Sequence, residues 1–206
     1  GSRDRASPSA TVPQPPAASE ISLAVLPFDN LGDTANAYFA DGIADQLRGK
    51  LTQLSGLTVI ARTSSVGYRG THDTPQQIAR ELGVRYLLTG TVSWAKGANG
   101  ESRVQVNPEL VEVTDSSAPA SKWQQPFDAS LTDVFKVQTD IATQVANALG
   151  VALGIGAQHE LAERPTKNLP AYDAFLRAES ISNGVASSDP ATLRRALKYY
   201  QQATSL

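Results

Sequence analysis

Apolar side chains recur along the first 150 residues with two different periods, which predict helices and strands in alternation. Residues 21–28 form a short apolar run, rich in branched side chains, as expected for a buried strand. Over residues 38–54 apolar side chains recur at steps of mostly four, which predicts an amphipathic helix that Gly56 ends. Residues 57–60 have the pattern of a second strand.

The next helix is marked at both of its ends. Thr74, Pro75 and Gln77 have the spacing of an N-terminal capping box, and Gly83 is the residue type that commonly ends a helix. After Gly83 the apolar period changes from about four to two. This change predicts a long strand over residues 84–94.

A turn at residues 96–100 predicts a hairpin between this strand and the next one. The next strand is interrupted by Asn107 and Pro108, and because proline cannot donate a ladder hydrogen bond we expect a bulge or an edge strand there. A strand at 122–127 and a long amphipathic helix to Leu149 follow. The order β-α-β-α-β-β-β-α predicts an α/β fold with a mixed sheet of about five strands and packed helices.

The last quarter of the chain has a different pattern. Residues 151–168 are rich in Gly and Ala and are predicted to be a hinge, partly helical. Residues 171–178 and 193–203 predict two antiparallel helices, and the second has the small-aromatic-small spacing of a tetratricopeptide helix. We therefore expect a C-terminal helical hairpin of tetratricopeptide type over 169–206, an incomplete repeat of a longer array.

Aromatic side chains in both parts are predicted to serve packing. Trp94 and Trp123 lie on strands that we expect to pair, so they are predicted to form a cross-strand pair. The aromatic residues of the helical hairpin are expected to fill the seam between its helices: Tyr172, Phe175, Tyr199 and Tyr200.

The first 20 residues are dominated by Pro, Ala and Ser and begin with Gly1 and Ser2, which have the form of a scar left by tag removal. Such a composition buries too little apolar surface to fold, so a disordered linker is predicted over 1–20. No run of about 18 apolar residues occurs, so no membrane span is predicted within the chain. The linker would fit a spacer next to a span that lies upstream.

Charge and composition narrow the range of partners. The 206 residues carry 18 basic and 20 acidic side chains, a formal charge of −2, which argues against a nucleic-acid partner. The chain has no cysteine, and its two histidines are His72 and His159, so thiolate and multi-histidine metal sites are excluded. We expect no metal and no cofactor.

The sequence lacks the recognised catalytic motifs. There is no GxSxG elbow, no GxxxxGK[ST] phosphate loop, no GxGxxG fingerprint and no HExxH pair. His72 lies in a predicted polar loop, and His159 is predicted to be a solvated helix residue. The chain is therefore predicted not to be an enzyme.

Polar residues follow the first two predicted strands, at the edge where α/β sheets commonly bind ligands. The run from Arg62 to Ser65 offers a guanidinium and three hydroxyls to an anion or a sugar, although a polar loop is also the ordinary way to solvate a turn. Asp41 either is a functional acid that the start of its helix presents to a ligand, or it stabilises the first turn of that helix. The candidate ligand-binding residues are Asp29, Asn30, Asp33, Asp41, Arg62, Ser64, Ser65 and Arg69.

Four ordered blocks of the sequence resemble a known bacterial family. They are SLAVLPFDNLGDTANAYFADGIADQL, GLTVIARTSSVGYRG, ARELGVRYLLTGTV and FDASLTDVFKVQTDIATQVANAL, and together they cover most of residues 21–150. They are similar to proteins related to the TolB amino-terminal domain. The resemblance implies an α/β domain over 21–150 that is followed by a tetratricopeptide array.

In that family the domain follows a signalling module and, usually, one transmembrane helix. The module is a serine/threonine kinase, a nucleotide cyclase or a winged-helix DNA-binding domain, and this chain resembles the kinase-linked members most. The resemblance implies an extracytoplasmic, periplasmic or cell-surface sensor of a membrane-anchored receptor, with a protein, a peptide or an envelope-derived ligand as partner. Two alternatives stay open: a small-molecule receptor with its pocket at the strand-end loops, and a structural spacer or homodimerisation unit.

Overall fold

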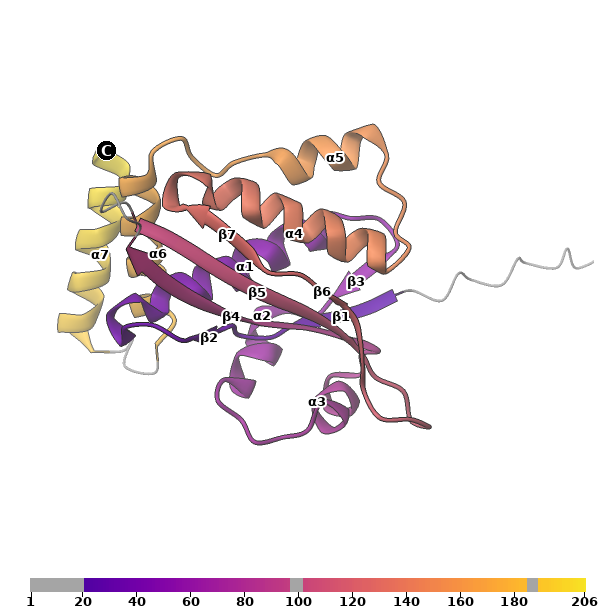
Figure 1. The fold of residues 1–206 in the computed structure, drawn as a ribbon. Helices are drawn as coiled ribbons and strands as arrows, with labels where there is room; N and C mark the ends of the chain where they lie inside the picture. The colour runs from indigo at the N-terminus through magenta and orange to yellow at the C-terminus, as the bar shows by residue number, and fades with distance from the viewer. Residues whose placement is uncertain (1–20, 97–101, 185–188) are drawn as a thin grey trace, which may run out of the picture.

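The computed structural model describes residues 21–96, 102–184 and 189–206 and arranges them around one mixed β-sheet (Figure 1). Helices α1 and α4 cover one face of the sheet, and α2 and α3 lie on the other. The predicted linker 1–20 and residues 97–100 of the predicted turn lie outside the described residues.

The main path of the sheet has five strands, the number predicted, and their spatial order is β3-β1-β4-β5-β6; two short strands extend it. Strand β1 is parallel to β3 and to β4, whereas β5 is antiparallel to β4 and β6 is antiparallel to β5. Strand β2 pairs with β4, and β7 pairs with β5. The strands are β1 (Ile21–Val25), β2 (Asp29–Asn30), β3 (Leu57–Val59), β4 (Tyr86–Lys96), β5 (Ser102–Glu112), β6 (Ala120–Gln124) and β7 (Phe127–Ser130).

Apart from α2, which forms where a polar loop was predicted, the helices follow the predicted order, with α5 in the predicted hinge before the C-terminal pair. The capping box of α3 is confirmed, because the Thr74 hydroxyl accepts a hydrogen bond from the Gln77 amide and the Gln77 side chain accepts one from the Thr74 amide. Gly83 ends α3 with φ of +66°. The helices are α1 (Ala37–Thr52), α2 (Arg62–Ser65), α3 (Pro75–Leu82), α4 (Val134–Ala148), α5 (Ile155–Ala162), α6 (Leu169–Ser182) and α7 (Pro190–Ser205).

The bulge or edge strand predicted at Asn107 and Pro108 does not occur. The register between β4 and β5 runs unbroken through Gly90 and Pro108, and β5 is an inner strand. On its other side β5 pairs with β7 up to Val106 and with β6 from Glu109, so the proline falls where the partner strand changes. The missing N–H therefore costs little, and the shift in register comes later, between Leu110 and Val111.

The single strand predicted at 122–127 is two strands, β6 and β7, separated by Gln125 and Pro126. The predicted tryptophan pair does not form either. Trp94 lies opposite Val104 and Trp123 lies opposite Leu110, at different places along β5. Trp94 packs on Phe39 of α1 instead, with ring centroids 4.6 Å apart.

Alternation along the strands divides the buried residues between two cores. On β1, Leu23 and Val25 belong to the larger core under α1 and α4, whereas Ala24 belongs to the smaller core under α3. The larger core also holds apolar residues of β4 and β5, and it continues into the C-terminal helices through Tyr172 and Leu176 of α6.

The segment between α4 and α6 is bound to the α/β part at the end of α5. The Lys50 ammonium of α1 is buried and donates hydrogen bonds to the carbonyl oxygens of Leu161 and Glu163, at 2.5 and 2.8 Å. The Thr139 hydroxyl of α4 donates to the same Leu161 oxygen at 2.8 Å. The division of the chain into domains at residues 150 and 168 stays a prediction.

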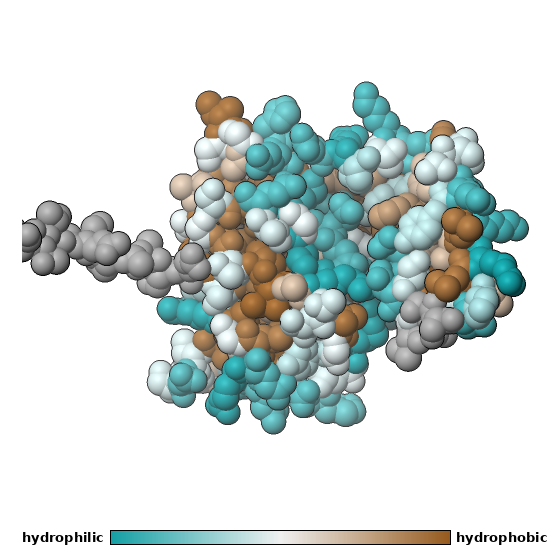
Figure 2. Space-filling model, turned by 180° about the vertical axis from the view of Figure 1, so that it is seen from behind, coloured by the Kyte–Doolittle hydropathy of each residue, from teal (hydrophilic) through white to brown (hydrophobic). Residues whose placement is uncertain are grey.

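Helices α6 and α7 form the predicted C-terminal pair. They are antiparallel, since Asn168 at the start of α6 donates a hydrogen bond to the Leu206 oxygen at the end of α7. Phe175 and Tyr200 meet in the seam between them, whereas Tyr172 turns into the core of the α/β part, contrary to the prediction. Figure 2 shows apolar atoms on the exposed side of α7, which carries Leu193 and Leu197.

Candidate functional site

Five charged side chains gather where β1 and β3 end, and we call them the strand-end cluster. Helix α1 supplies Asp41, Asp45 and Arg48, while Arg62 begins α2 and Arg69 follows the short 3-10 turn after it. Because β1 and β3 are parallel neighbours, their carboxyl ends meet at one edge of the sheet. This edge is where α/β folds commonly bind ligands.

Arg48 is the buried centre of the cluster, with 9% of its surface exposed. One terminal nitrogen donates to Asp45, and the other donates to the Val25 carbonyl oxygen at 3.0 Å and to the Ser65 hydroxyl at 3.5 Å. Its Nε–H group is buried and has no partner among the described residues. Asp45 also accepts from Nε of Arg62, at 2.9 and 3.1 Å to its two oxygens, so it bridges two guanidinium groups.

Asp41 forms the second ion pair of the cluster, with Arg69. Burial raises the pKa of the Asp41 carboxyl above its usual 3.8, Arg69 opposes this effect, and the neighbouring Asp45 adds to it. Three guanidinium groups therefore face two carboxylates, and the cluster carries one net positive charge at neutral pH.

Replacing Arg69 by glutamine is expected to raise the pKa of Asp41 further, because the substitution removes a hydrogen bond and a positive charge from the carboxylate. A carboxyl whose pKa is higher in the folded protein than in the unfolded chain costs stability as the pH rises through that interval. Titration of the Asp41 carboxyl carbon by NMR measures the shift. Arg80→Gln on α3 is the control, and an unchanged or lower pKa in Arg69→Gln contradicts the expectation.

A groove of about 540 Å³ runs from the cluster along the contact between α1 and α6, and we call it the α1–α6 groove. Its floor and walls hold Arg62 of the cluster, side chains of α1 that include Gln46 and Gln53, and Leu176, Ser180 and Asn183 of α6. Gly49 of α1 is exposed in it, with no other residue within 4 Å of the position of a Cβ.

Helix α6 approaches α1 closely beside this groove. A Cβ on Gly42 would lie 2.6 Å from both terminal carbons of Leu176, so glycine allows the leucine to lie against the helix backbone. Tyr38 donates a hydrogen bond to Asp173, and the Arg177 guanidinium lies 4.4 Å from the centre of the Tyr38 ring. The groove is therefore formed jointly by the α/β part and the C-terminal helices.

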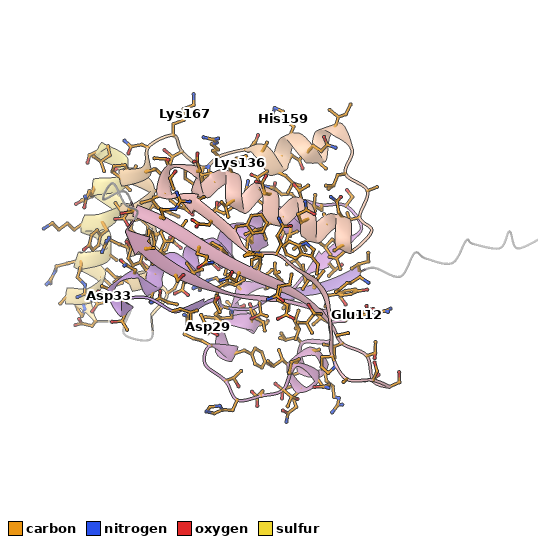
Figure 3. The ribbon with its side chains drawn as sticks, in the orientation of Figure 1. Asp29, Asp33, Glu112, Lys136, His159 and Lys167 are labelled. Atoms are coloured by element: carbon orange, nitrogen blue, oxygen red, sulfur yellow. The ribbon has the colours of Figure 1, made fainter. Side chains whose placement is uncertain are left out.

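The structure brings together Asp41, Arg62, Ser65 and Arg69 from the predicted set, and it separates the first-strand loop from them. After Val25 the chain continues along β4 and pairs with it as β2, which carries Asp29, Asn30 and Asp33 away from the end of β3 (Figure 3). Asn30 and Asp33 bond to backbone groups of their own turn.

Two predictions about local structure are wrong. The run from Arg62 to Ser65 is a turn of helix rather than a loop, and the fully buried Ser65 hydroxyl donates to the Arg62 carbonyl oxygen at 3.3 Å, so it does not face solvent. Ser64 is exposed. Asp41 lies in the second turn of α1 and pairs with Arg69, so it is not an acid of the first turn.

Sequence reasoning missed Asp45 and Arg48. Their spacing of three along a helix was available as a clue, because such residues are neighbours on one face and pair when their charges are opposite. His159, by contrast, is exposed on α5 as predicted and points away from the sheet (Figure 3).

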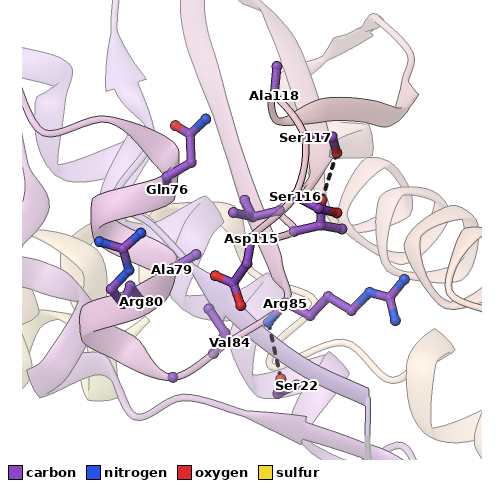
Figure 4. A pocket seen from close by; sticks show the side chains of 13 residues that line it. Ser22, Gln76, Ala79, Arg80, Val84, Arg85, Asp115, Ser116, Ser117 and Ala118 are labelled. Atoms are coloured by element: carbon purple, nitrogen blue, oxygen red, sulfur yellow. Dashed lines mark hydrogen bonds between the residues drawn. The ribbon is translucent and has the colours of Figure 1, made fainter.

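A second, wider depression of about 900 Å³ lies between the end of α3 and residues 113–118 (Figure 4). The Asp115 carboxylate points into it near Arg80 and Arg85, and all its charged side chains are exposed. Arg85 is already paired with Glu112, its Nε lying 2.9 Å from a carboxylate oxygen. Water screens such exposed charges, so this depression offers weaker binding than the strand-end cluster.

The chain is similar to a protein described as putative adenylate cyclase 3 of Rhizobium meliloti (strain 1021). The two are 38% identical over 170 residues, which is 82% of this chain and 28% of the relative. The chain thus spans little more than a quarter of that protein's length. No protein-family model matches the chain.

Comparison with solved structures finds more distant likenesses. Lipoprotein GNA1162 of Neisseria meningitidis has a TM-score of 0.43 and 15% identity, over 62% of this chain and 99% of its own. The hypothetical protein CT253 of Chlamydia trachomatis has a TM-score of 0.42 and 16% identity, over 53% and 71%. Such scores do not establish a common fold. None of the described helices is long and apolar enough to cross a membrane.

Proposed function

We propose that this chain is a non-enzymatic sensing and interaction module of a bacterial signalling protein. The observation that carries the proposal is the similarity to a segment of the putative adenylate cyclase, of which the chain matches only 28%. The resemblance to domains related to the TolB amino-terminal domain supports the same role, since that family includes proteins with a nucleotide cyclase or a kinase as the signalling module.

The chemistry of the strand-end cluster supports binding rather than catalysis. A general base needs a carboxylate that is free to take a proton from a substrate. Asp41 is held by Arg69, and Asp45 is held by both Arg48 and Arg62. These ion pairs occupy both carboxylates as hydrogen-bond acceptors, which suits a binding surface.

The proposal includes the position of the module in its protein. By the family resemblance it lies outside the cytoplasm, beyond a membrane anchor, and binds a protein, a peptide or an envelope-derived ligand. The alternative of a spacer or homodimerisation unit is tested by light scattering over a range of concentrations. A monomer at every concentration argues against dimerisation.

The proposed role is tested with the Rhizobium relative. This chain replaces the matching segment of that protein in one chimera, and the segment is deleted in a second. We expect the chimera to preserve the cyclic AMP accumulated by expressing cells and the deletion to change it. An unchanged level in the deletion overturns the regulatory role, and turnover of ATP–Mg²⁺ or a nitrophenyl ester by the purified folded chain overturns the non-enzymatic one.

A second candidate function is a small-molecule receptor, and the strand-end cluster favours it. The cluster combines a buried arginine, whose Nε–H has no partner among the described residues, with an adjoining groove large enough for a small ligand.

A further inference from the structure

The strand-end cluster has more hydrogen-bond donors than its own acceptors use. A guanidinium group has five N–H donors and no acceptor. Arg62 uses its Nε for Asp45, and its two terminal nitrogens have no partner among the described residues. Arg69 donates to Asp41, and the buried Nε of Arg48 has no partner in the part of the chain that the structure describes. The described part of the cluster therefore has more N–H donors than acceptors, and Arg62 and Arg69 present theirs at a partly exposed surface.

The net charge of the cluster indicates which acceptor fits. One positive charge is left over after Asp41 and Asp45 are counted, so a group with a single negative charge neutralises the site. A phosphate with close to two negative charges would be repelled by both aspartates. A carboxylate carries one charge and matches the planar fork of a guanidinium with two parallel hydrogen bonds.

The groove next to the cluster indicates what the rest of the ligand is. Gln46 and Gln53 of α1 and Asn183 of α6 place amide side chains along it, and Ser180 adds a hydroxyl. Glu179 also lines the groove, and its carboxylate already accepts hydrogen bonds from Asn183 and Tyr200. Amides both donate and accept, which suits the alternating N–H and C=O groups of a peptide. Leu176 contributes an apolar wall, and Gly49 leaves the space above α1 open.

We propose that the α1–α6 groove binds a short peptide with a free carboxylate, which pairs with Arg62 and Arg69 while the peptide lies along α1. The inference deepens the receptor function proposed above and rests on it. Because the groove has one wall on the α/β part and one on α6, the bound peptide contacts both. The bound peptide would therefore stabilise the observed arrangement of the two parts, because it binds this arrangement more tightly than one in which the parts are separated.

The proposal is tested by calorimetric titration of the purified chain with acetyl-trialanine, with the same peptide as its C-terminal amide, with acetate and with inorganic phosphate, all at matched ionic strength. We expect the free acid to bind at least about tenfold more tightly than the amide, as for a charge-assisted hydrogen bond. Acetate should bind more weakly than the acid peptide, and phosphate more weakly than acetate.

Two variants distinguish the contribution of the carboxylate to binding from that of the rest of the peptide. Arg62→Gln should weaken the binding of the acid peptide and of acetate about tenfold. Arg80 is an exposed arginine in the other depression, so Arg80→Gln should change the binding of neither. Gly49→Leu fills the groove without touching the cluster, so it should weaken the binding of the peptide and leave the binding of acetate unchanged. The Gly49 variant keeps the test decisive if Arg62→Gln folds poorly.

Several outcomes overturn the proposal. They are equal binding of acid and amide, tighter binding of phosphate than of acetate, loss of binding in Arg80→Gln instead of Arg62→Gln, and the absence of binding by every carboxylate probe. None of them alters the cyclic AMP result of the chimera and the deletion, so a failure here is distinguishable from a failure of the signalling role.

Discussion

Replacing Tyr172 by alanine is expected to destabilise the protein by about 3–5 kcal/mol, the usual cost of deleting a buried aromatic ring. Tyr172 is 2% exposed and lies between two rings of the α/β part, with centroids 6.4 Å from Phe39 and 4.7 Å from Phe135. Its hydroxyl accepts a hydrogen bond from the buried Gln138 amide at 3.2 Å. The substitution leaves a cavity where α6 joins the core.

Urea denaturation, followed by far-UV circular dichroism and by tryptophan fluorescence, measures this effect. Both tryptophans lie on strands of the α/β part, and Trp94 packs on Phe39, so fluorescence reports on the side of the core that Tyr172 touches. We expect both midpoints to fall together. A fluorescence midpoint that does not move would show that α6 is not part of the core.

Two controls separate the ring from its hydroxyl and from its helix. Tyr172→Phe keeps the ring and removes the acceptor of the Gln138 bond, so it should cost about 1–3 kcal/mol, as when one buried hydrogen-bond partner is left unpaired. Phe175→Ala, on the same helix, removes a ring that is 38% exposed and should cost less than Tyr172→Ala.

Replacing Gly42 by leucine is expected to cost about 1–3 kcal/mol, the usual penalty for overfilling a packed contact. Even a Cβ at this position would lie 2.6 Å from the terminal carbons of Leu176, and the larger side chain would force α6 away from α1. The displacement would also disturb the Tyr38–Asp173 hydrogen bond beside it.

Gly49→Leu is the matched control, the same substitution on the same helix. Apart from the backbone of α1 itself, no described residue lies within 4 Å of its Cβ position, so leucine should stabilise α1 there by about 0.5–1 kcal/mol through its higher helix propensity. The difference between the two midpoints of denaturation measures the packing of α6 on α1. Equal effects of the two substitutions would contradict the close approach.

Local patterns were sufficient for most of the secondary structure. The capping box at Thr74 and the left-handed residue Gly83 mark the ends of α3 because the groups that bond there are at most a few residues apart. The change of apolar period after Gly83 likewise predicted β4, since a strand exposes alternate residues to one core. Pro108 misled the prediction because its effect depends on which strand lies beside it.

The candidate site was only partly accessible to sequence reasoning. Arg62 and Arg69 could be selected because they follow a predicted strand at the edge where ligands commonly bind. The separation of Asp29 from them was not visible, because it depends on β2 pairing with β4 rather than on any property of the loop itself. Arg48 was missed because a charged residue in an amphipathic helix is ordinarily solvated, whereas here Val25 and Asp45 hold it in the interior.

By itself the sequence determined the order and type of most of the elements, the ends of α3 and the mixed α/β class, since these depend on contacts between near neighbours and on periodicity. The tertiary structure decided the rest: the burial of Arg48, the turn of helix at Arg62–Ser65 and the union of α6 with the core. These features depend on bonds such as that from Tyr38 to Asp173, between residues 135 positions apart. Such partners meet only after the sheet and helices have packed, and no local pattern specifies them.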